Sequence, residues 1–308
     1  MPADPSTLPA LTRAGYFCSN LLIRGLIGLS GLIPYKYRIP FMGWLVSRAA
    51  PLAGFDKRIR SNLELVCPDL SEAEIKRLCR AVPDNVGRSL LEMYAGESFL
   101  NRAANWSISG PGLEALDDAR AASRPVLMMT GHFGNYLAAR AKLAQLGHQV
   151  GGLYRRMANP YFNEHYVAAM EVSGKPLFEQ GRRGMMELVR HLKKGGIAAI
   201  VGDLHAHGGI ELQFFGQPAV TSTAPAELAL KYDALFLPVY AIRRENGLDF
   251  DIVVLDPVPH SDPATMTQAI NDGLEALVRE HMDQWFWIHR RWKPWFDVGL
   301  QSQAVEDN

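Results

Sequence analysis

The stretch Val126–Tyr136 has the sequence VLMMTGHFGNY, in which an apolar run leads directly into a histidine flanked by two glycines. Four apolar residues in succession predict a buried strand, of the kind found in parallel sheets that are covered on both faces. Asn135 is a favoured N-cap residue, so a helix is expected to begin there. The stretch therefore predicts a strand that delivers His132 to its carboxyl end, immediately before a helix.

The alternation of strand and helix continues along the rest of the chain. Strands are expected at 126–130, 149–154, 197–202, 235–243 and 249–255. Helices are expected at 135–146, 160–172, 183–194, 223–232 and 266–282. This pattern predicts an α/β fold with a largely parallel sheet flanked by helices. The turn-prone segment Glu245–Gly247 predicts that the last two strands form an antiparallel hairpin, which makes the sheet mixed.

The residues before this pattern are helical in character. Helices are expected at 57–66, 71–82 and 84–94, the second of them opened by a capping box of Ser71 and Glu74. With 308 residues, of which 48% are hydrophobic, the chain suits one large domain with a small appendage. We interpret residues 56–300 as an α/β domain, residues 1–55 as a separate N-terminal segment and residues 301–308 as a tail.

The N-terminal segment combines positive charge with apolar residues. Residues 1–60 carry eight basic and two acidic side chains, whereas the remainder carries 24 basic and 30 acidic ones. The apolar stretch 25–34 is too short to span a bilayer, which takes about 20 apolar residues. We therefore expect a helical anchor at a membrane surface, with aromatic and cationic residues at its edges. The alternative is a helical hairpin packed on the core of the domain.

Composition excludes several classes of function. The formal net charge is zero, which argues against a nucleic-acid-binding protein of the basic-patch type. The three cysteines have no metal-site or disulfide spacing. The chain also lacks a G-x-x-x-x-G-K-[ST] loop, a G-x-G-x-x-G helix opening and a G-x-S-x-G elbow, so nucleotide chemistry and serine hydrolysis lose support. No metal and no cofactor are expected.

Ligands of open α/β sheets bind beyond the carboxyl ends of the strands, which here means just after Thr130, Tyr154 and Gly202. His132 stands at the first of these places, and a histidine there can be a general base because the unperturbed pKa of the residue type is near 6.5. Gly131 and Gly134 leave space beside its imidazole for backbone or substrate. A structural histidine is the alternative, and spacing alone leaves the two interpretations equal.

The segment Thr130–Tyr136 resembles the H-x4-D/E signature of the lysophospholipid-type acyltransferases. It is most similar to the late lipid A acyltransferases of the lauroyl and myristoyl type and to the phosphatidylinositol mannoside acyltransferases. Further similar motifs follow in the expected order: Ser61-Asn62-Leu63 with Cys67-Pro68, Tyr154-Arg155 with Asn159-Pro160, Asp203, Phe214–Ala219 and His289–Trp292. The resemblance covers roughly the whole chain, and the combination is more specific than any single motif.

The resemblance implies transfer of an acyl chain from a thioester donor, on acyl carrier protein or coenzyme A, to a hydroxyl of a lyso-lipid acceptor. It also implies a location at the cytoplasmic face of the bacterial inner membrane. The acceptor is expected to be a lipid A-type molecule or a lyso-aminolipid. The residues that the matching motifs assign to substrate binding are Gly131, Gly134, Asn135, Arg155, Asn159 and Phe215.

One position departs from the family pattern. Leu137 stands where the family has the Glu or Asp that orients the histidine and stabilises its imidazolium. The first candidate to replace this acid is Glu211, because a similar Gly-Val-Glu-Val segment of the mannoside acyltransferases presents a glutamate to the histidine. Asp203, at the end of the strand 197–202, is the second. Alternatively, Glu211 is a solvated strand carboxylate and Asp203 caps a loop.

Other charged and aromatic clusters have weaker interpretations. Arg155 suits a phosphate of an acceptor headgroup or of phosphopantetheine, because guanidinium binds phosphate bidentately, while Arg156 suits a surface ion pair equally well. Arg182 and Arg183 lie near the same rim. Four C-terminal tryptophans, at 285, 287, 292 and 295, suit either a membrane interface or an aromatic lid packed on the sheet.

We therefore expect a membrane-associated O-acyltransferase in which His132 is the general base. A catalytically silent lipid-binding homologue is the main alternative, because the family acid is missing at Leu137. A metal-dependent hydrolase that uses Asp203, His205 and His207 is a further alternative, although no second cluster of ligands accompanies these residues.

Overall fold

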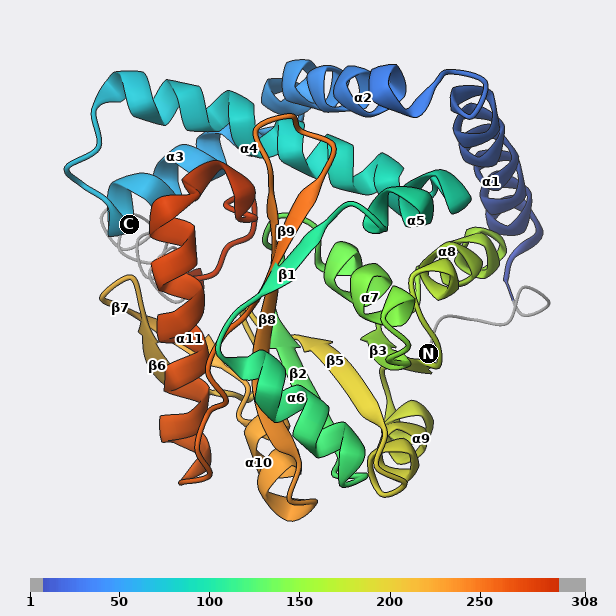
Figure 1. The fold of residues 1–308 in the computed structure, drawn as a ribbon. Coiled ribbons are helices and arrows are strands. Elements are labelled where there is room, and N and C mark those ends of the chain that lie inside the picture. The colour runs from blue at the N-terminus through green and yellow to red at the C-terminus, as the bar shows by residue number, and fades with distance from the viewer. Residues whose placement is uncertain (1–7, 294–308) are drawn as a thin grey trace.

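The computed structural model describes residues 8–293, which form one α/β body with helices on both faces of a twisted sheet (Figure 1). The main sheet has the strand order β1-β9-β8-β2-β5-β3-β4. Its strands are β1 (Ser107–Ser109), β2 (Val126–Thr130), β3 (Val150–Tyr154), β4 (Leu177–Glu179), β5 (Ile197–Val201), β8 (Leu235–Arg243) and β9 (Phe250–Val254). Only β8 and β9 pair antiparallel within it, so the predicted mixed, largely parallel sheet is confirmed.

The helices divide between the two faces of this sheet. Val126 and Met128 of β2 pack with α6 (Gly112–Ala121) and α7 (Tyr136–Gln145), whereas Leu127 and Met129 pack with the opposite helices. The opposite face is covered by α9 (Arg182–Leu192), α10 (Ala224–Lys231) and α11 (Pro263–Glu280). A strand that is buried on both faces has no polar side, which explains the unbroken apolar run at 126–129.

The remaining helices lie along one end and one side of the sheet, where α1 contacts α8 (Figure 1). They are α1 (Ala10–Ser30), α2 (Tyr35–Ala49), η2 (Ala50–Ala53), α3 (Phe55–Val66), α4 (Glu72–Met93), α5 (Glu97–Ala103), α8 (Pro160–Val172) and η3 (Met282–Gln284). A third apolar cluster joins α3 and α4 to Trp285, Trp287 and Trp292, whose side chains are almost completely buried. For these three tryptophans the aromatic-lid interpretation holds, while Trp295 and the tail 301–308 lie outside the described residues.

The sequence predicted two helices where the structure has one. The expected helices 71–82 and 84–94 form the single helix α4, which continues through Pro83. Proline removes one helical hydrogen bond and favours a kink. Here α2 crosses α4 so closely that a Cβ at Gly43 would lie 2.6 Å from an Asp84 oxygen, and one at Gly87 would lie 2.7 Å from the Met42 carbonyl oxygen. This packing keeps the two halves in one helix. The capping box of Ser71 and Glu74 is formed as predicted.

Strands β1 and β4 and helices α5 and α6 were not predicted from the sequence. Strands β1 and β4 have three residues each, which is too few for a periodic pattern. A separate antiparallel hairpin of β6 (Ile210–Phe214) and β7 (Gln217–Thr221) follows the end of β5. The predicted hairpin of β8 and β9 is present.

The N-terminal helices have many exposed apolar side chains. In α1 these include Leu11, Leu22, Leu26 and Leu29, which are 59–87% exposed, and α2 adds Phe41, Trp44 and Leu45. Helix α1 contacts the rest of the body mainly at α8, whereas α2 packs along α4. Among residues 8–293, no helix combines the length and the apolar character that crossing a bilayer requires.

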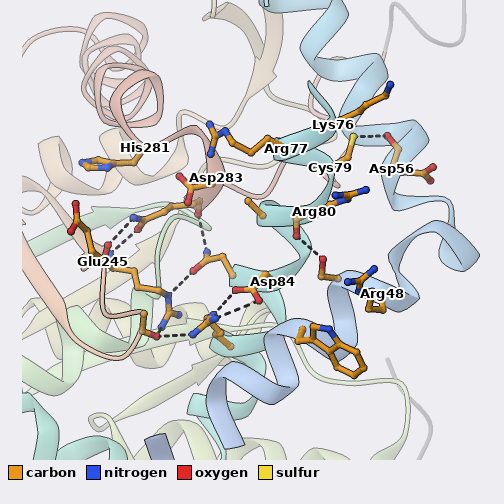
Figure 2. A pocket seen from close by; sticks show the side chains of 18 of the residues that line it. Arg48, Asp56, Lys76, Arg77, Cys79, Arg80, Asp84, Glu245, His281 and Asp283 are labelled. Carbon is orange, nitrogen blue, oxygen red and sulfur yellow. Dashed lines mark hydrogen bonds and ion pairs between the residues drawn. The ribbon is translucent and has the colours of Figure 1, made fainter. Parts of the chain in front are cut away.

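A groove of about 1610 Å³ lies between α2, α4 and the hairpin of β8 and β9 (Figure 2). Cationic side chains such as Arg77 and Arg80 share its wall with carboxylates such as Asp84 and Glu245. His132 is not among the residues that line this groove.

Candidate active site

His132 and Asp203 meet at the carboxyl edge of the sheet. Strands β2 and β5 are neighbours in parallel register, with Thr130 opposite Val201, and each of the two residues follows its strand by two positions. The Nδ1 atom of His132 lies 2.8 Å from Asp203 Oδ1, and the backbone N–H of His132 donates to Oδ2 at 2.8 Å. The topology thus forms a histidine–carboxylate pair from residues 71 positions apart.

Asp203 is held as a buried carboxylate. Its side chain is 2% exposed, and Oδ2 accepts a further hydrogen bond from Trp285 Nε1 at 2.9 Å. Burial raises the pKa of the Asp203 carboxyl, but the charge of His132 and the hydrogen bonds from His132 and Trp285 outweigh it, so the pKa lies below its ordinary value. The carboxylate is therefore ionised at neutral pH and accepts a hydrogen bond from Nδ1–H, so in the neutral form of the imidazole the free lone pair is on Nε2.

The structure places the two other acid positions away from this pair. Leu137 is in the first turn of α7 and is buried in the apolar core, with 1% exposure. Glu211 is exposed on β6 opposite Val220, and within residues 8–293 it forms no hydrogen bond with His132. The geometry thus pairs His132 with the second candidate, Asp203, and not with the first.

The space beside Gly131 and Gly134 is occupied by other parts of the protein. A Cβ at Gly131 would lie 3.0 Å from the Leu274 side chain and 3.2 Å from the Asp203 carboxylate. Gly134 has a φ of 54°, and a Cβ there would lie 1.8 Å from the Ala241 carbonyl oxygen. The N–H groups of His132 and Gly134 are also engaged already, with Asp203 and with the Gln284 carbonyl. These two donors are therefore not free to stabilise an oxyanion.

Two aromatic rings lie beside the imidazole. The rings of Tyr136 and Phe286 both have their centroids 5.7 Å from that of His132. The His132 side chain is 30% exposed, so it remains accessible between these rings. An accessible base beside apolar rings suits a substrate that brings a hydroxyl group on a largely apolar body.

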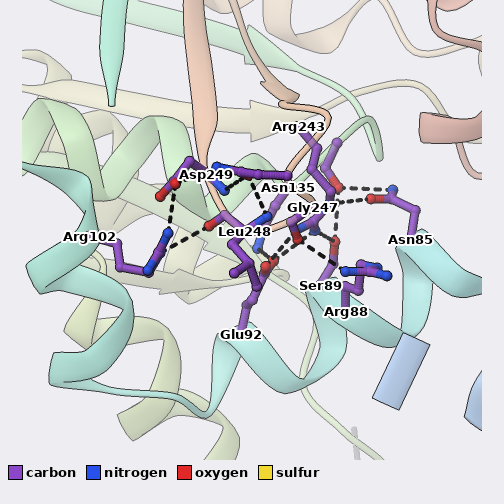
Figure 3. Close-up of polar contacts among 12 residues, drawn as sticks. Asn85, Arg88, Ser89, Glu92, Arg102, Asn135, Arg243, Gly247, Leu248 and Asp249 are labelled. Carbon is purple, nitrogen blue, oxygen red and sulfur yellow. Dashed lines mark hydrogen bonds and ion pairs between the residues drawn. The ribbon is translucent and has the colours of Figure 1, made fainter. Parts of the chain in front are cut away.

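The loop after His132 rests on a buried polar network (Figure 3). The Arg243 guanidinium binds both oxygens of Glu92, at 2.5 and 2.8 Å, and the Glu92 side chain is fully buried. Glu92 also accepts from Asn135 Nδ2 at 2.8 Å, while Asn135 Oδ1 caps α7 by accepting from the Leu137 N–H. The predicted N-cap is thus confirmed, and the Asn135 side chain faces the network.

Two further side chains of α4 hold Gly134 in this network. Asn85 Nδ2 and Ser89 Oγ donate to the Gly134 carbonyl at 3.2 and 2.9 Å. Asn85 Oδ1 in turn accepts from Arg243 Nε at 2.7 Å. A buried polar group without its partner costs about 1–3 kcal/mol, and more if it is charged, so the members of this network depend on one another.

The C-terminal segment packs over the Asp203 loop. His289 Nε2 accepts a hydrogen bond from the His205 N–H at 3.1 Å, and Asn62 Nδ2 donates to the carbonyls of Trp287 and His289. Burial lowers the pKa of His289 to about 4, so it is neutral and can accept. The SNL and HRRW motifs therefore meet in space around the loop that carries Asp203.

His205 and His207 lie close together, with ring centroids 5.2 Å apart. Within residues 8–293, however, no group of three or more His, Cys, Asp or Glu side chains is arranged to hold a metal ion. Asp203, the third member of the proposed metal set, is engaged with His132 and Trp285. The metal-hydrolase hypothesis gains no support from this arrangement.

The other residues assigned to substrate binding have different surroundings. Arg155 is exposed in a pocket at the ends of β3 and β4. Asn159 caps α8 and donates to the Tyr16 carbonyl and to Ser19 Oγ of α1. Phe215 is 3% exposed and packs on Trp287. Among these three, Arg155 is exposed, Asn159 is half-buried and Phe215 is buried.

The sequence did not reveal the residues that hold Asp203 and the His132 loop in place. Trp285 was recognised only as part of an aromatic cluster, and Glu92, Asn85 and Arg243 were not singled out. A signal was available for Glu92, because it follows Leu90 and Leu91 in a helical segment, and a carboxylate on a buried helix face needs a partner. The identity of that partner, Arg243, depends on the packing of α4 against β8.

Comparison with known proteins places these features in a family context. The family model described as "Bacterial lipid A biosynthesis acyltransferase" matches residues 7–294. The chain is 27% identical over 249 residues to the lipid A biosynthesis lauroyltransferase of Escherichia coli, covering 77% of this chain and 78% of that protein. It is 24% identical over 272 residues to the phosphatidylinositol mannoside acyltransferase of Mycobacterium tuberculosis strain H37Rv, covering 81% and 86%.

Breaking the buried ion pair should destabilise the fold strongly. Arg243→Met leaves the Glu92 carboxylate buried without its counter-ion, and we expect a loss of about 3–5 kcal/mol in the free energy of unfolding, measured by urea denaturation. The matched control is Arg183→Met, which breaks the exposed pair with Glu187 and should cost at most about 1 kcal/mol. Equal losses in the two variants would show that the buried Arg243–Glu92 pair contributes no more to stability than the exposed pair.

The low pKa of His289 makes the stability depend on pH. In the unfolded chain His289 binds a proton near pH 6.5, whereas in the folded chain it does so only near pH 4. The neutral His289 makes its full contribution to the free energy of unfolding above pH 6.5, and this contribution is lost as the pH falls from 6.5 to 4. His289→Gln keeps an acceptor for His205 but cannot be protonated, so the melting temperature should fall less over this interval. Identical pH profiles for wild type and variant would contradict this role.

Proposed function

Because the chain belongs to the bacterial lipid A biosynthesis acyltransferase family and is therefore an acyltransferase that acts on a lipid acceptor, we propose that His132 is its general base. The proposed reaction transfers a fatty acyl chain from an acyl thioester to a hydroxyl group of a lyso-lipid. The observation that carries the proposal is the contact of His132 Nδ1 with the buried carboxylate of Asp203.

The proposed mechanism follows from the state of the imidazole. Nε2 of His132 takes the proton of the acceptor hydroxyl while the oxygen attacks the thioester carbonyl carbon. The C–S bond then breaks, the thiolate leaves, and the imidazolium returns the proton to the sulfur. Asp203 holds the ring in the required tautomer and stabilises the imidazolium, as the carboxylate of a catalytic triad does. The products are an ester and a free thiol.

The missing family acid does not remove this chemistry. The carboxylate comes from the neighbouring strand β5, while position 137 has joined the core as a leucine. A catalytically silent protein would need no buried carboxylate at the imidazole, since ionised groups are costly to bury without function or partners. The arrangement therefore favours an active enzyme over a silent lipid-binding homologue.

The substrates are proposed at the level of chemical class. The acceptor is a lyso-lipid with a free hydroxyl, either lipid A-type or a lyso-aminolipid, and the donor is an acyl chain on acyl carrier protein or coenzyme A. The named relatives act on lipid A and on phosphatidylinositol mannoside. Arg155 is proposed to contact substrate because it is an exposed cation that directly follows β3 at the carboxyl edge of the sheet. The substrate-binding roles of Gly131, Gly134, Asn135, Asn159 and Phe215 remain predictions.

We also propose that α1 and α2 rest on the cytoplasmic face of the inner membrane. Leu22, Leu26 and Leu29 lie three and four residues apart, on one face of α1, and are 59–65% exposed. An exposed apolar helix face beside cationic residues suits the boundary between headgroups and acyl chains. A helix lying in this boundary satisfies the prediction of an anchor without crossing the bilayer.

The catalytic assignment is tested with purified variants. His132→Ala should lower the rate of thioester consumption in the presence of a lyso-lipid acceptor by about 10²–10⁴-fold, the usual contribution of positioned proton transfer. Asp203→Asn keeps the shape of the side chain but removes its charge, so turnover should also fall strongly. Glu211→Gln is the matched control, because it makes the same change in an exposed carboxylate and should leave turnover within about twofold.

Each outcome discriminates between hypotheses. If His132→Ala acylates at the wild-type rate, the proposed base is wrong. If Glu211→Gln is inactive while Asp203→Asn is fully active, the charge comes from the hairpin and the pairing has been misassigned. If wild type is inert with donors on carrier protein and on coenzyme A, and with lipid A-type and aminolipid acceptors, the silent homologue is favoured.

The membrane assignment is tested without deleting structure. Replacing Leu22, Leu26 and Leu29 together by Asp should weaken binding to vesicles that contain anionic lipid by at least ~100-fold, because each buried leucine contributes roughly 1.5–3 kcal/mol. The control is Leu146→Asp, at the end of α7, which alters a leucine with 46% exposure outside the proposed surface. Unchanged vesicle binding by a folded triple variant would rule out α1 as the contact.

A further inference from the structure

A pocket of about 1350 Å³ opens at the carboxyl ends of β3 and β4. Its lining includes four arginines, at 155, 156, 182 and 183, and two carboxylates, Glu179 and Glu187. Strands β3 and β4 belong to the same sheet as β2 and β5, and all four run parallel. The pocket therefore opens at the same edge of the sheet as His132 and Asp203.

The four arginines and two glutamates give this pocket a formal charge of +2, and among the described residues three of the arginines form no ion pair. Glu187 pairs with Arg183, and Glu179 lies within 3.5 Å of the Tyr154 hydroxyl. Within residues 8–293, Arg155, Arg156 and Arg182 form no ion pair and no side-chain hydrogen bond. Nε of Arg156 is buried and has no hydrogen-bond partner among these residues. A buried guanidinium N–H without an acceptor is costly, so a ligand that supplies acceptors is indicated.

The backbone adds donors to the same wall. Helix α9 begins at Arg182, and its N-cap residue Gly181 provides no side-chain hydrogen bond to the first turn. The helix starts close against the end of β4, since a Cβ at Gly184 would lie 1.9 Å from the Glu179 carbonyl oxygen. First-turn N–H groups carry no intrahelical partner and favour anions, so they reinforce the charge of Arg156 and Arg182.

The position of the pocket limits which part of a substrate it can hold. The strand order is β2-β5-β3-β4, and neighbouring strands lie about 4.8 Å apart, so the pocket is roughly 10–14 Å from His132 along the sheet edge. A group bound there is remote from the reacting hydroxyl and from the thioester carbonyl. It belongs to the acceptor headgroup or to the distal part of the donor.

From these observations we infer that the pocket is a phosphate-binding subsite, in which Arg156 and Arg182, together with Arg155, hold a phosphate ester that is remote from the reacting atoms. This inference rests on the proposed acyl transfer for its biological meaning but not for its test. Guanidinium groups bind phosphate oxygens bidentately and are more weakly hydrated than ammonium, which suits a partly buried site. Two sources carry the required group: the phosphate of a lipid headgroup and the phosphopantetheine of the donor.

The test measures binding directly, by isothermal titration of the full chain with two matched pairs of probes. The donor pair is coenzyme A and pantetheine, and the lipid pair is dihexanoyl phosphatidic acid and dihexanoylglycerol. Wild type should bind the phosphate-bearing member of at least one pair tenfold or more tightly than its partner. Arg156→Gln and Arg182→Gln should each weaken that binding by ~10–100-fold, the contribution of a charge-assisted hydrogen bond.

The matched control is Arg190→Gln, which removes the same charge from an exposed position on α9 outside the pocket and should change affinity by less than twofold. Selectivity for coenzyme A assigns the phosphate to the donor, and selectivity for phosphatidic acid assigns it to the acceptor. Equal affinity within both pairs, or an equal loss in Arg190→Gln, overturns the subsite.

The result is separable from the catalytic proposal. His132→Ala should bind both probe pairs as wild type does, because the imidazole is distant from the pocket. If the wild type binds phosphate selectively but transfers no acyl group, the proposed function fails and the subsite stands. If Arg156→Gln and Arg182→Gln transfer acyl groups with an unchanged KM for donor and acceptor, the subsite fails and the catalytic assignment stands.

Discussion

The fully buried carboxylate of Glu92 constrains the fold at the point where chemistry is proposed. It is bound by both nitrogens of the Arg243 fork and by the Asn135 amide, so it joins α4, β8 and the cap of α7. A charge in this position is tolerated only when all its partners are in place. The geometry of the loop that carries His132 therefore depends on helices and strands far from it in sequence.

This constraint explains why the acid beside His132 can come from another strand. The Glu92 network holds the loop after His132. The carboxyl end of β5 then brings Asp203 within hydrogen-bond distance of both the backbone and the ring of His132. Position 137 is then free to join the apolar core, where Leu137 packs. The family motif places its acid five residues after the histidine, whereas the carboxylate that contacts His132 in this structure follows the neighbouring strand and also accepts from Trp285.

Much of the fold followed from the sequence alone. Apolar runs of four or five residues, Asn135 at a helix start and the turn at Glu245–Gly247 determined the strand and helix alternation and hence a mixed, largely parallel sheet. These signals are local, because periodicity and capping act within one or two turns of chain. His132 and the two candidate acids were also found from the sequence. Strands of three residues and the continuity of α4 through Pro83 were not, since packing decides them.

Which of the two candidate acids, Asp203 or Glu211, contacts His132 was decided only by the tertiary structure. Both carboxylates lie in the 15 residues that follow the start of β5, and the resemblance to the mannoside acyltransferases favoured Glu211. The parallel pairing of β2 with β5 brings Asp203 to the imidazole, whereas the hairpin of β6 and β7 turns Glu211 to solvent. The gathering of Arg156 and Arg182 in one pocket has the same origin. Sequence determined which residues stand at strand ends, and the order of strands across the sheet, which is set by long-range packing, decided which of those ends meet.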